Sequence, residues 1–418
     1  MNKYRGRIYF GVSLLTLSCG IQSVYANNAF SPESQWMLGD WNGQRTALQQ
    51  QGYDFSFGYT GEIATVLDAK QHSSDGTEYA DQFALGAHLD LEKILGWQDT
   101  EAQITITERN GHSLSQTSDA LAGHLSSAQE VWGRGQTWRL TDFWIKKQFL
   151  DQKLDIKVGR FGEGEDFNSF DCDFQNLALC GSQVGNWVGD QWYNWPVSQW
   201  AARVKYNVRP DLYAQVGVYE YNPENLERGK GFNLSTDGSH GAIIPAEVVW
   251  QPKVGNEQLS GEYRVGYYYS TADAQEITQE ATSHKQGGWL VAKQQLTAHQ
   301  GDASRGLTGF INLTLHDSDT NTVSDMQNVG LVYKGLMNSR PQDEIAIGVA
   351  RISINDDVNN IVDTRGLQNE EYNAEIYYGM HATNWLTIRP NVQYVHHVGA
   401  YKNGENAWVG GIKFQTVF

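Results

Sequence analysis

Long hydrophobic runs are missing from most of this 418-residue sequence, and its mean hydropathy is negative. After residue 26 no apolar stretch approaches the ~20 residues that a membrane-spanning helix needs. A bundle of membrane helices is therefore excluded for residues 27–418. If this part of the chain crosses a bilayer, it must do so as a closed β-barrel, because only a closed sheet satisfies every backbone group in lipid.

Basic residues are also scarce, with 31 Lys and Arg against 48 Asp and Glu, which gives a net charge of −17. We expect no nucleic-acid partner, because neutralising phosphates requires a basic surface. Three of the cations precede the apolar run at residues 8–21, and the small residues Val24 and Ala26 follow it. This pattern predicts a cleaved secretory signal peptide over residues 1–26, whose removal changes the net charge to −20. A lipoprotein site at Cys19 is the alternative, but Thr16 fits the first position of that box poorly.

Only three cysteines occur, and Cys19 lies within the expected signal peptide. The exported chain would keep Cys172 and Cys180. An even number of cysteines in an oxidising compartment favours a disulfide over a metal or redox site. We therefore predict a Cys172–Cys180 bridge, no metal and no cofactor.

Common catalytic motifs are absent as well. The sequence contains no Gly-x-Ser-x-Gly, no His-Glu-x-x-His and no phosphate-binding loop. The single histidine pair, His396 and His397, would face opposite sides of a strand. We expect no catalytic residues and no enzymatic activity. A non-conducting barrel enzyme such as an outer-membrane lipase, or a closed-barrel binder, remains the competing class.

Alternation of apolar and polar residues is what the sequence has in abundance. In residues 54–63, for example, Phe55, Phe57 and Tyr59 alternate with Asp54, Ser56 and Thr60. Sixteen such segments predict strands near residues 53–67, 81–94, 100–110, 138–150, 152–162, 198–208, 211–222, 241–252, 259–271, 286–299, 304–317, 326–336, 342–354, 370–383, 385–398 and 405–418.

The connections between these segments alternate between long polar stretches, such as 111–137 and 163–197, and tight turns, such as Arg209-Pro210. Outer-membrane barrels have this rhythm, because short periplasmic turns alternate with long extracellular loops, and a soluble sandwich or propeller has no reason to show it. Aromatic residues near strand ends fit the two interfacial girdles of such a barrel. They are Tyr53, Trp97, Trp138, Trp250, Trp289 and Trp385.

Three stretches resemble the carbohydrate-selective porins of the OprB family. They are Trp36 to Arg45 (WMLGDWNGQR) with Gly52-Tyr-Asp-Phe, the block from Cys172 to Arg203, and Asn384 to Tyr394 (NWLTIRPNVQY). The resemblance runs from about residue 34 to the end. It implies a sixteen-stranded, monomer-like pore that can assemble into homotrimers and passes monosaccharides and related small solutes down a gradient. It also implies that Phe418 belongs to an outer-membrane assembly signal.

The predicted fold is thus all-β, a sixteen-stranded antiparallel transmembrane β-barrel over residues 53–418. Residues 27–52 would form an N-terminal periplasmic segment with a short helix ended by Gly52. The third long connection, 163–197, would fold into the lumen, where the predicted disulfide would restrain it. We expect the protein in the bacterial outer membrane, surrounded by lipid and lipopolysaccharide.

The predicted pore residues combine inward-facing charges with aromatic and amide side chains, because sugars offer hydroxyls around a weakly apolar ring. They are Glu62, Arg109, Asp142, Trp144, Arg160, Asp166, Asn168, Trp187, Trp192, Trp195 and Arg203. Among the cations we favour Arg109, Arg160 and Arg203, since each lies on a strand near the third connection. The predicted function is passive, carbohydrate-selective diffusion. A general or organic-acid-selective porin is the alternative.

Overall fold

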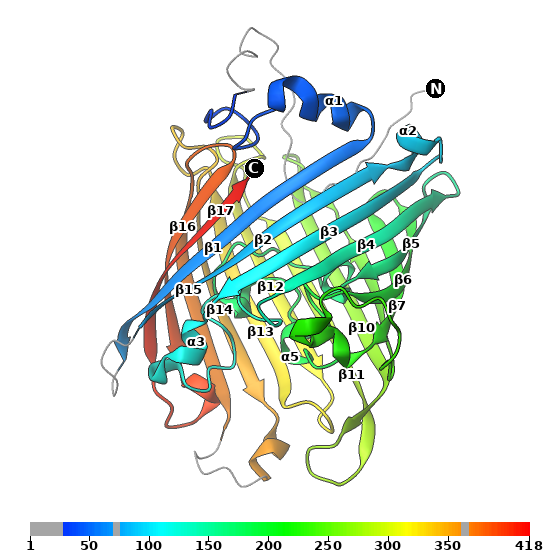
Figure 1. Ribbon diagram of the computed structural model, residues 1–418. Helices are drawn as coiled ribbons and strands as arrows, with labels where there is room; N and C mark the ends of the chain where they lie inside the picture. The colour runs from blue at the N-terminus through cyan, green and yellow to red at the C-terminus, as the bar shows by residue number, and fades with distance from the viewer. Residues whose placement is uncertain (1–27, 70–75, 361–367) are drawn as a thin grey trace.

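The computed structural model describes residues 28–69, 76–360 and 368–418, which form a closed antiparallel β-barrel (Figure 1). The expected signal peptide, residues 1–26, lies outside the described residues. The strands are β1 (Tyr53–Ala69), β2 (Thr77–Asp90), β3 (Thr100–Gly111), β4 (Trp138–Phe149), β5 (Leu154–Phe161), β6 (Gln199–Arg209), β7 (Leu212–Tyr221), β8 (Gly241–Trp250), β9 (Lys253–Val254), β10 (Leu259–Gln275), β11 (Thr282–Gln295), β12 (Gly306–His316), β13 (Val323–Lys334), β14 (Glu344–Ile354), β15 (Glu370–His381), β16 (Leu386–His396) and β17 (Ala407–Val417).

The barrel closes because β17 pairs with β1, for example at Ile63 and Ile412, while β1 also pairs with β2. No wall strand is left with an unpaired edge, which a bilayer would not tolerate. β9 is a two-residue extension of the hairpin between β8 and β10, so the wall has sixteen strands within the described residues. The predicted all-β, sixteen-stranded antiparallel barrel is confirmed.

The strand boundaries differ from the prediction mainly at the turns. The second strand was predicted to reach residue 94, but it ends at Asp90 and α2 (Leu91–Leu95) follows. The Asp90 carboxylate accepts a hydrogen bond from the backbone N–H of Lys93, which caps this helix. The connections at 296–305 and 335–343 are also longer than predicted.

The N-terminal segment contains η1 (Trp41–Gly43) and α1 (Gln44–Gln50). Gly52, at φ 101°, ends the helical region, and a Cβ there would lie 2.9 Å from the carbonyl oxygen of Asp90. The predicted short helix before Gly52 is therefore present. Arg45 anchors it by donating to the backbone oxygens of Phe418 (2.6 Å) and Phe55 (2.7 Å), at the seam between β17 and β1.

Short helices occupy the long connections. They are α3 (Leu114–Thr117) and η2 (Asp119–Leu121) between β3 and β4, α4 (Glu163–Asp166), η3 (Leu177–Leu179) and α5 (Val184–Trp187) between β5 and β6, η4 (Pro223–Leu226) and η5 (Arg228–Lys230) after β7, η6 (Asp356–Asn360) after β14, and η7 (Val398–Ala400) after β16. None of the helices in the described ranges has the length and apolar composition needed to cross a membrane.

Two predictions about side chains outside the predicted pore set are wrong. Trp289, expected in an interfacial girdle, is 4% exposed and donates from Nε1 to Glu247 (2.8 Å), so it lies on the inward face of β11. His396 and His397 do not face opposite sides, because His397 follows the end of β16 with φ 55° and the two rings stack at 3.8 Å. Leaving the extended conformation removes the alternation on which that prediction depended.

Candidate functional site

A continuous cavity of about 2720 Å³ runs through the barrel, and it lies off centre. Its wall residues come mainly from β1 to β6, with Tyr221 at the end of β7, Asp273–Gln275 of β10, Lys285 of β11 and Gln415 of β17. The connections 112–137 and 162–198 supply most of the remaining lining. The N-terminal segment, the β2–β3 and β4–β5 turns, and Thr320 and Thr322 supply the rest. The inward faces of β8 and β12 to β16 contribute nothing to it among the described residues.

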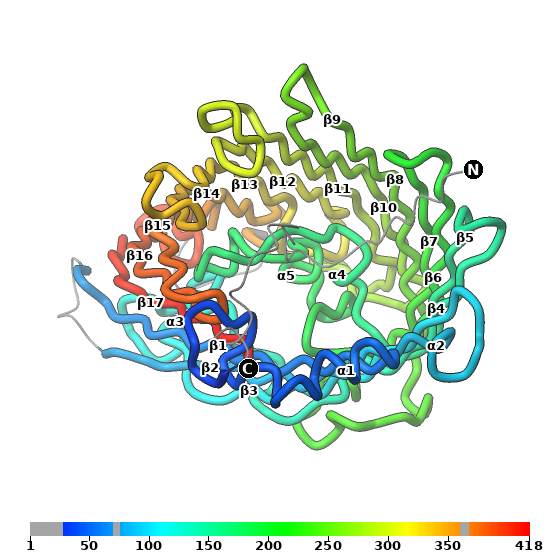
Figure 2. Tube along the Cα trace, turned by 90° about the horizontal axis from the view of Figure 1, so that it is seen from above, coloured from blue at the N-terminus to red at the C-terminus, as the bar shows by residue number. Residues whose placement is uncertain are grey.

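The connection 162–198 occupies the other side of the barrel interior, and α4 and α5 lie within the ring of strands when it is viewed from above (Figure 2). Phe167, Val184 and Trp192 pack against inward-facing side chains of β7 to β11, including Tyr268 and Trp289. A second cluster joins residues 174–179 to inward-facing side chains of β12 to β15. The polar passage therefore lies mainly on the β1–β6 side.

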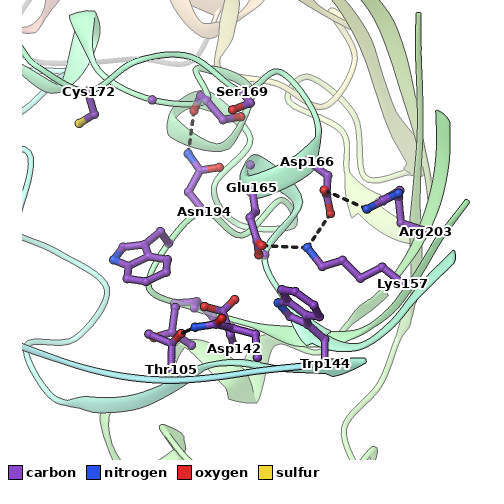
Figure 3. Close-up of a pocket in the computed structure, with 18 of the residues that line it drawn as sticks. Thr105, Asp142, Trp144, Lys157, Glu165, Asp166, Ser169, Cys172, Asn194 and Arg203 are labelled. Atoms are coloured by element: carbon purple, nitrogen blue, oxygen red, sulfur yellow. Dashed lines mark hydrogen bonds and ion pairs between the residues drawn. The ribbon is translucent and has the colours of Figure 1, made fainter. Parts of the chain in front are cut away.

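A network of charges joins α4 to the wall beside the passage (Figure 3). Lys157 of β5 donates to Glu165 (2.8 Å) and Asp166 (2.9 Å), and Arg203 of β6 contacts Asp155 (2.5 Å) and Asp166 (3.6 Å). Burial would raise the pKa of Asp166, but the neighbouring Lys157 and Arg203 hold it below its ordinary value. Asp166 therefore stays ionised and fixes the start of the connection to β5 and β6.

Gln82 of β2 brings together two of the predicted pore residues. Its side-chain oxygen accepts hydrogen bonds from Nε of Arg109 on β3 (2.8 Å) and from Nε1 of Trp195 in the connection 162–198 (2.8 Å). All three residues line the cavity, and Trp195 keeps 38% of its surface exposed. An aromatic ring and a guanidinium group thus stand next to each other on the passage.

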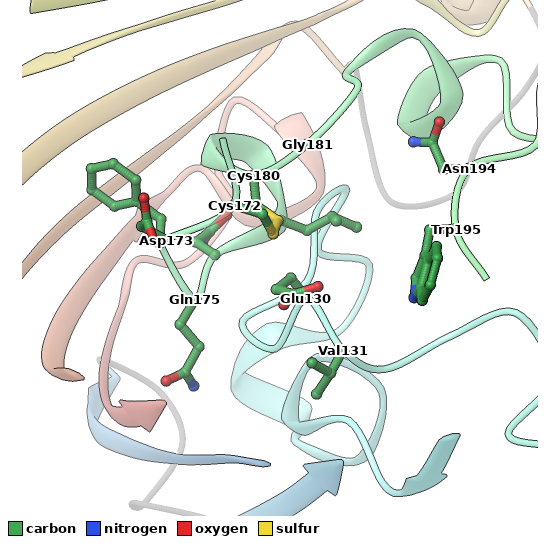
Figure 4. The surroundings of a disulfide bond; sticks show 12 residues. Glu130, Val131, Cys172, Asp173, Gln175, Cys180, Gly181, Asn194 and Trp195 are labelled. Atoms are coloured by element: carbon green, nitrogen blue, oxygen red, sulfur yellow. A yellow bond between two sulfur atoms is a disulfide. The ribbon is translucent and has the colours of Figure 1, made fainter. Parts of the chain in front are cut away.

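The predicted disulfide is present between Cys172 and Cys180 (Figure 4). Both cysteines line the cavity, as does Glu130 from the connection 112–137, which lies beside the bridge. The bridge closes the hairpin that contains η3. Residues 174–179 inside this hairpin pack on β12 to β15, and α5 follows the hairpin in the chain.

The two ends of the connection 162–198 meet at Glu163. Its backbone N–H donates to the carbonyl oxygen of Tyr193 (3.2 Å), and its carboxylate accepts from the N–H of Tyr193 (3.0 Å). Complete burial raises the pKa of Glu163 to about 8. At neutral pH this carboxyl group is therefore mostly protonated, which makes its burial tolerable.

Comparison with known proteins gives a consistent result. Residues 74–418 match the model of the carbohydrate-selective porin family OprB. The chain belongs to this family. It is 57% identical to Porin B of Pseudomonas aeruginosa, over 95% of this chain and 94% of that protein. The high-pH structure of Pseudomonas putida OprB superimposes with a TM-score of 0.90 at 56% identity, over 94% of this chain and all of that one. The low-pH structure of the same protein gives a TM-score of 0.62 at 47% identity, over 92% and 99% of the two chains.

The protein is thus a passive, carbohydrate-selective porin of the bacterial outer membrane, and its relatives are channels. Of the eleven predicted pore residues in this porin, the cavity lining contains seven, namely Arg109, Asp142, Trp144, Asp166, Trp187, Trp195 and Arg203. The remaining four lie elsewhere.

Three of these four are buried anchors on the inward side. Glu62 accepts from the N–H of Val131 (3.2 Å), and the Asn168 side-chain oxygen accepts from Ser182 Oγ (3.2 Å) and the N–H of Val184 (3.0 Å). Trp192 has no exposed surface and packs edge-on against Tyr268 and Trp289 at 5.7 Å. These side chains hold the connections in place and present no surface to a solute.

Arg160 lies on the opposite face of the wall from the expected one. It is in register with Phe143 and shares the outward face of β5 with Val158, both of which are more than 40% exposed. The connection after β7 covers it, so that Arg160 donates to the carbonyl oxygens of Asn233 and Ser198, both at 2.5 Å. Lys157, three residues earlier on β5, is instead the cation of this strand that faces the third connection.

The prediction missed several lining residues, including Gln82, Gln103, Glu130, Lys157, Glu165 and Asn194. Gln82 and Gln103 are polar positions of predicted strands, and their alternation could have identified them. No local pattern marks Glu130, Glu165 or Asn194, because their place depends on how two long connections fold.

Proposed function

We propose that this porin conducts neutral monosaccharides and similar small polyols along the β1–β6 wall, and that the connection 162–198 narrows that path. The carrying observation is the contact of Arg109 and Trp195 with one oxygen of Gln82 on the cavity surface. The exposed indole ring offers a face for the C–H side of a sugar, while the guanidinium offers donors for its hydroxyls. Such contacts are weak enough individually for the solute to leave again.

Seven residues would contact solute in this proposal, namely the lining residues Arg109, Asp142, Trp144, Asp166, Trp187, Trp195 and Arg203. Acidic side chains outnumber basic ones in this lining, with thirteen Asp and Glu against eight Lys and Arg. The excess of negative charge disfavours small organic anions by repulsion, which argues against an organic-acid porin. The protein would act as a channel without catalysis.

Liposome swelling tests the proposal. Purified porin is reconstituted, and rates are compared for glucose, a polyol of similar size, gluconate and a disaccharide. We expect glucose to enter faster than gluconate, and the Trp195→Ala variant to lose part of that preference. Trp97→Ala is the matched control, because Trp97 is 52% exposed outside the cavity lining. Equal rates for glucose and gluconate would contradict the proposed selectivity.

We further propose that residues 28–52 lie at the periplasmic mouth and that the outer rim contacts lipopolysaccharide. Homotrimer assembly belongs to the same proposal. Asp81 and Glu108 face outward, since their neighbours Gln82 and Arg109 line the cavity, and carboxylates on a lipid-facing surface are unfavourable. A subunit interface over β2 and β3 would cover them. Mass measurement in detergent tests this assembly, and a single-chain mass would contradict it.

A further inference from the structure

Lys413 of β17 is a lysine with no exposed surface at the seam of the barrel. It is in register with Glu62 of β1 on one side and with Arg389 of β16 on the other. Its Nζ donates to Glu130 Oε1 (2.9 Å), to the carbonyl oxygen of Cys172 (3.0 Å) and to that of Phe174 (3.1 Å). An ammonium group has three protons, so this set of acceptors uses all of them.

These acceptors belong to different connections. Glu130 comes from the segment between β3 and β4, whereas Cys172 and Phe174 come from the segment between β5 and β6. Glu130 and Cys172 border the cavity, and so does Cys180 through the disulfide. Lys413 does not line the cavity. Any influence on solutes must therefore pass through the groups that it holds.

The charges around Lys413 explain why a cation is needed there. Glu62 Oε1 lies 3.5 Å from Nζ, and the other oxygen of Glu62 accepts from the N–H of Val131, next to Glu130. Both carboxylates are largely removed from water, since the side chains of Glu62 and Glu130 are 0% and 12% exposed. Without the ammonium group they would repel each other and release the segment 130–131 from the wall.

Neighbouring wall residues hold the same hairpin in a similar way. Glu375 of β15 accepts from the N–H groups of Gln175 (3.0 Å) and Asn176 (2.7 Å), and Arg389 of β16 donates to Asp173 (2.8 Å). These contacts hold one connection. Gln393 of β16 contacts both connections, because it donates to the carbonyl oxygen of Ala128 (3.0 Å) and accepts from Asn176 (3.0 Å). Lys413 differs in that a single ammonium group donates to both connections.

We propose that Lys413 is a positioning residue that sets the edge of the solute path by fixing Glu130 and the Cys172–Cys180 hairpin to the barrel seam. The proposal rests on the proposed function, because it assumes that these groups border the path taken by sugars. Lys413 would act through them without touching solute.

The test uses the double variant Lys413→Met with Glu62→Gln, which removes one buried charge of each sign. Lys334→Met is the control, since Lys334 on β13 makes no ion pair within the ranges that the structure covers. Folded protein is quantified by the heat-dependent mobility shift on gels. Single-channel current and liposome swelling are then measured. We expect a normal amount of folded barrel, a noisier open-channel current and a loss of discrimination between glucose and a disaccharide. The control should behave like the wild type.

A folded double variant with wild-type current noise and discrimination would overturn the proposal. If the double variant does not fold, Glu130→Gln replaces it, because this change removes the Lys413–Glu130 ion pair and leaves Glu62 and the two backbone acceptors of Lys413 in place. Glu130→Gln should raise the current noise, and an unchanged trace would again overturn the proposal. Failure of the proposed function is recognised separately. In that case the wild type itself does not discriminate between solutes, while the noise measurement still tests the positioning role.

Discussion

The two halves of the barrel interior have opposite characters although their strands follow the same alternation. On the β1–β6 side, inward-facing residues such as Gln103, Lys157 and Arg203 border the polar passage. On the β7–β15 side, inward-facing Tyr268, Phe310 and others form a packed core with the connection 162–198. A porin wall can therefore serve as a channel lining in one sector and as a hydrophobic core in another.

The difference shows what holds the connection in place. On the packed side it is held by apolar contact with the wall. On the passage side it is held by buried ion pairs, as between Lys157 and Asp166. The apolar contacts hold most of the connection 162–198 against the wall. The ion pairs hold the part of it that borders the passage, and they keep that surface polar. The following predictions separate the two contributions.

The largest effect is expected from Trp192→Ala on the packed side. Removing this fully buried ring should destabilise the packed connection by about 3 to 5 kcal/mol, the usual cost of an aromatic truncation in a core. Single-channel conductance and the solute size limit should both rise, because the segment no longer stays against the wall. Trp97→Ala controls for loss of an exposed tryptophan. Unchanged conductance would show that the packed side does not hold the connection.

A pH effect of intermediate size should come from Glu163. Its pKa is raised from 4.5 to about 8 while the connection 162–198 is packed inside the barrel. Between these pH values the packed state keeps a proton on Glu163, whereas the state in which the connection has detached from the wall loses it. The free energy that favours the packed state should therefore fall as pH rises from 4.5 to about 8 and change no further above that pH. Open-channel noise measured across this range should rise with pH, and Glu163→Gln should flatten the profile. A wild-type profile that is flat, or that falls with pH, would contradict this sign.

Removing the disulfide that restrains the hairpin should have a smaller effect. Replacing Cys172 and Cys180 by Ser removes a bridge over eight residues, worth about 2 to 3 kcal/mol of loop-closure free energy. The contacts of Glu375 and Lys413 with the same hairpin remain. We expect more current noise but preserved glucose selectivity, measured in planar bilayers and by liposome swelling. Complete loss of selectivity would mean that the wall contacts alone do not position the hairpin.

The smallest effect is expected for Trp195→Phe on the passage side. This change keeps an aromatic face but removes the hydrogen bond to Gln82, typically worth about 1 kcal/mol. Glucose flux should change only slightly, whereas Trp195→Ala should change it more. Equal fluxes for the two variants would exclude the ring face as the recognition element.

Much of the fold could be predicted from the sequence, because a strand records its two faces in every second residue. The strand that begins at Tyr53 and the closing strand that ends at Val417 were both located correctly in this way. Alternation failed where the backbone left the extended state, as at Leu91 and His397. Arg160 was selected for its place next to the third connection, and alternation along β5 would have put it on the outward face with Val158.

The site divides in the same way. The sequence by itself determined the barrel, the pairing of Cys172 with Cys180 and the inward side chains Arg109, Asp142 and Arg203, because these follow from alternation and cysteine count. Only the tertiary structure decided that Trp192 is core while Trp195 borders the passage, and that Lys413 joins two connections. The reason is physical. A long connection has no period that relates its residues to the wall, so their roles depend on contacts between segments that are far apart in the chain.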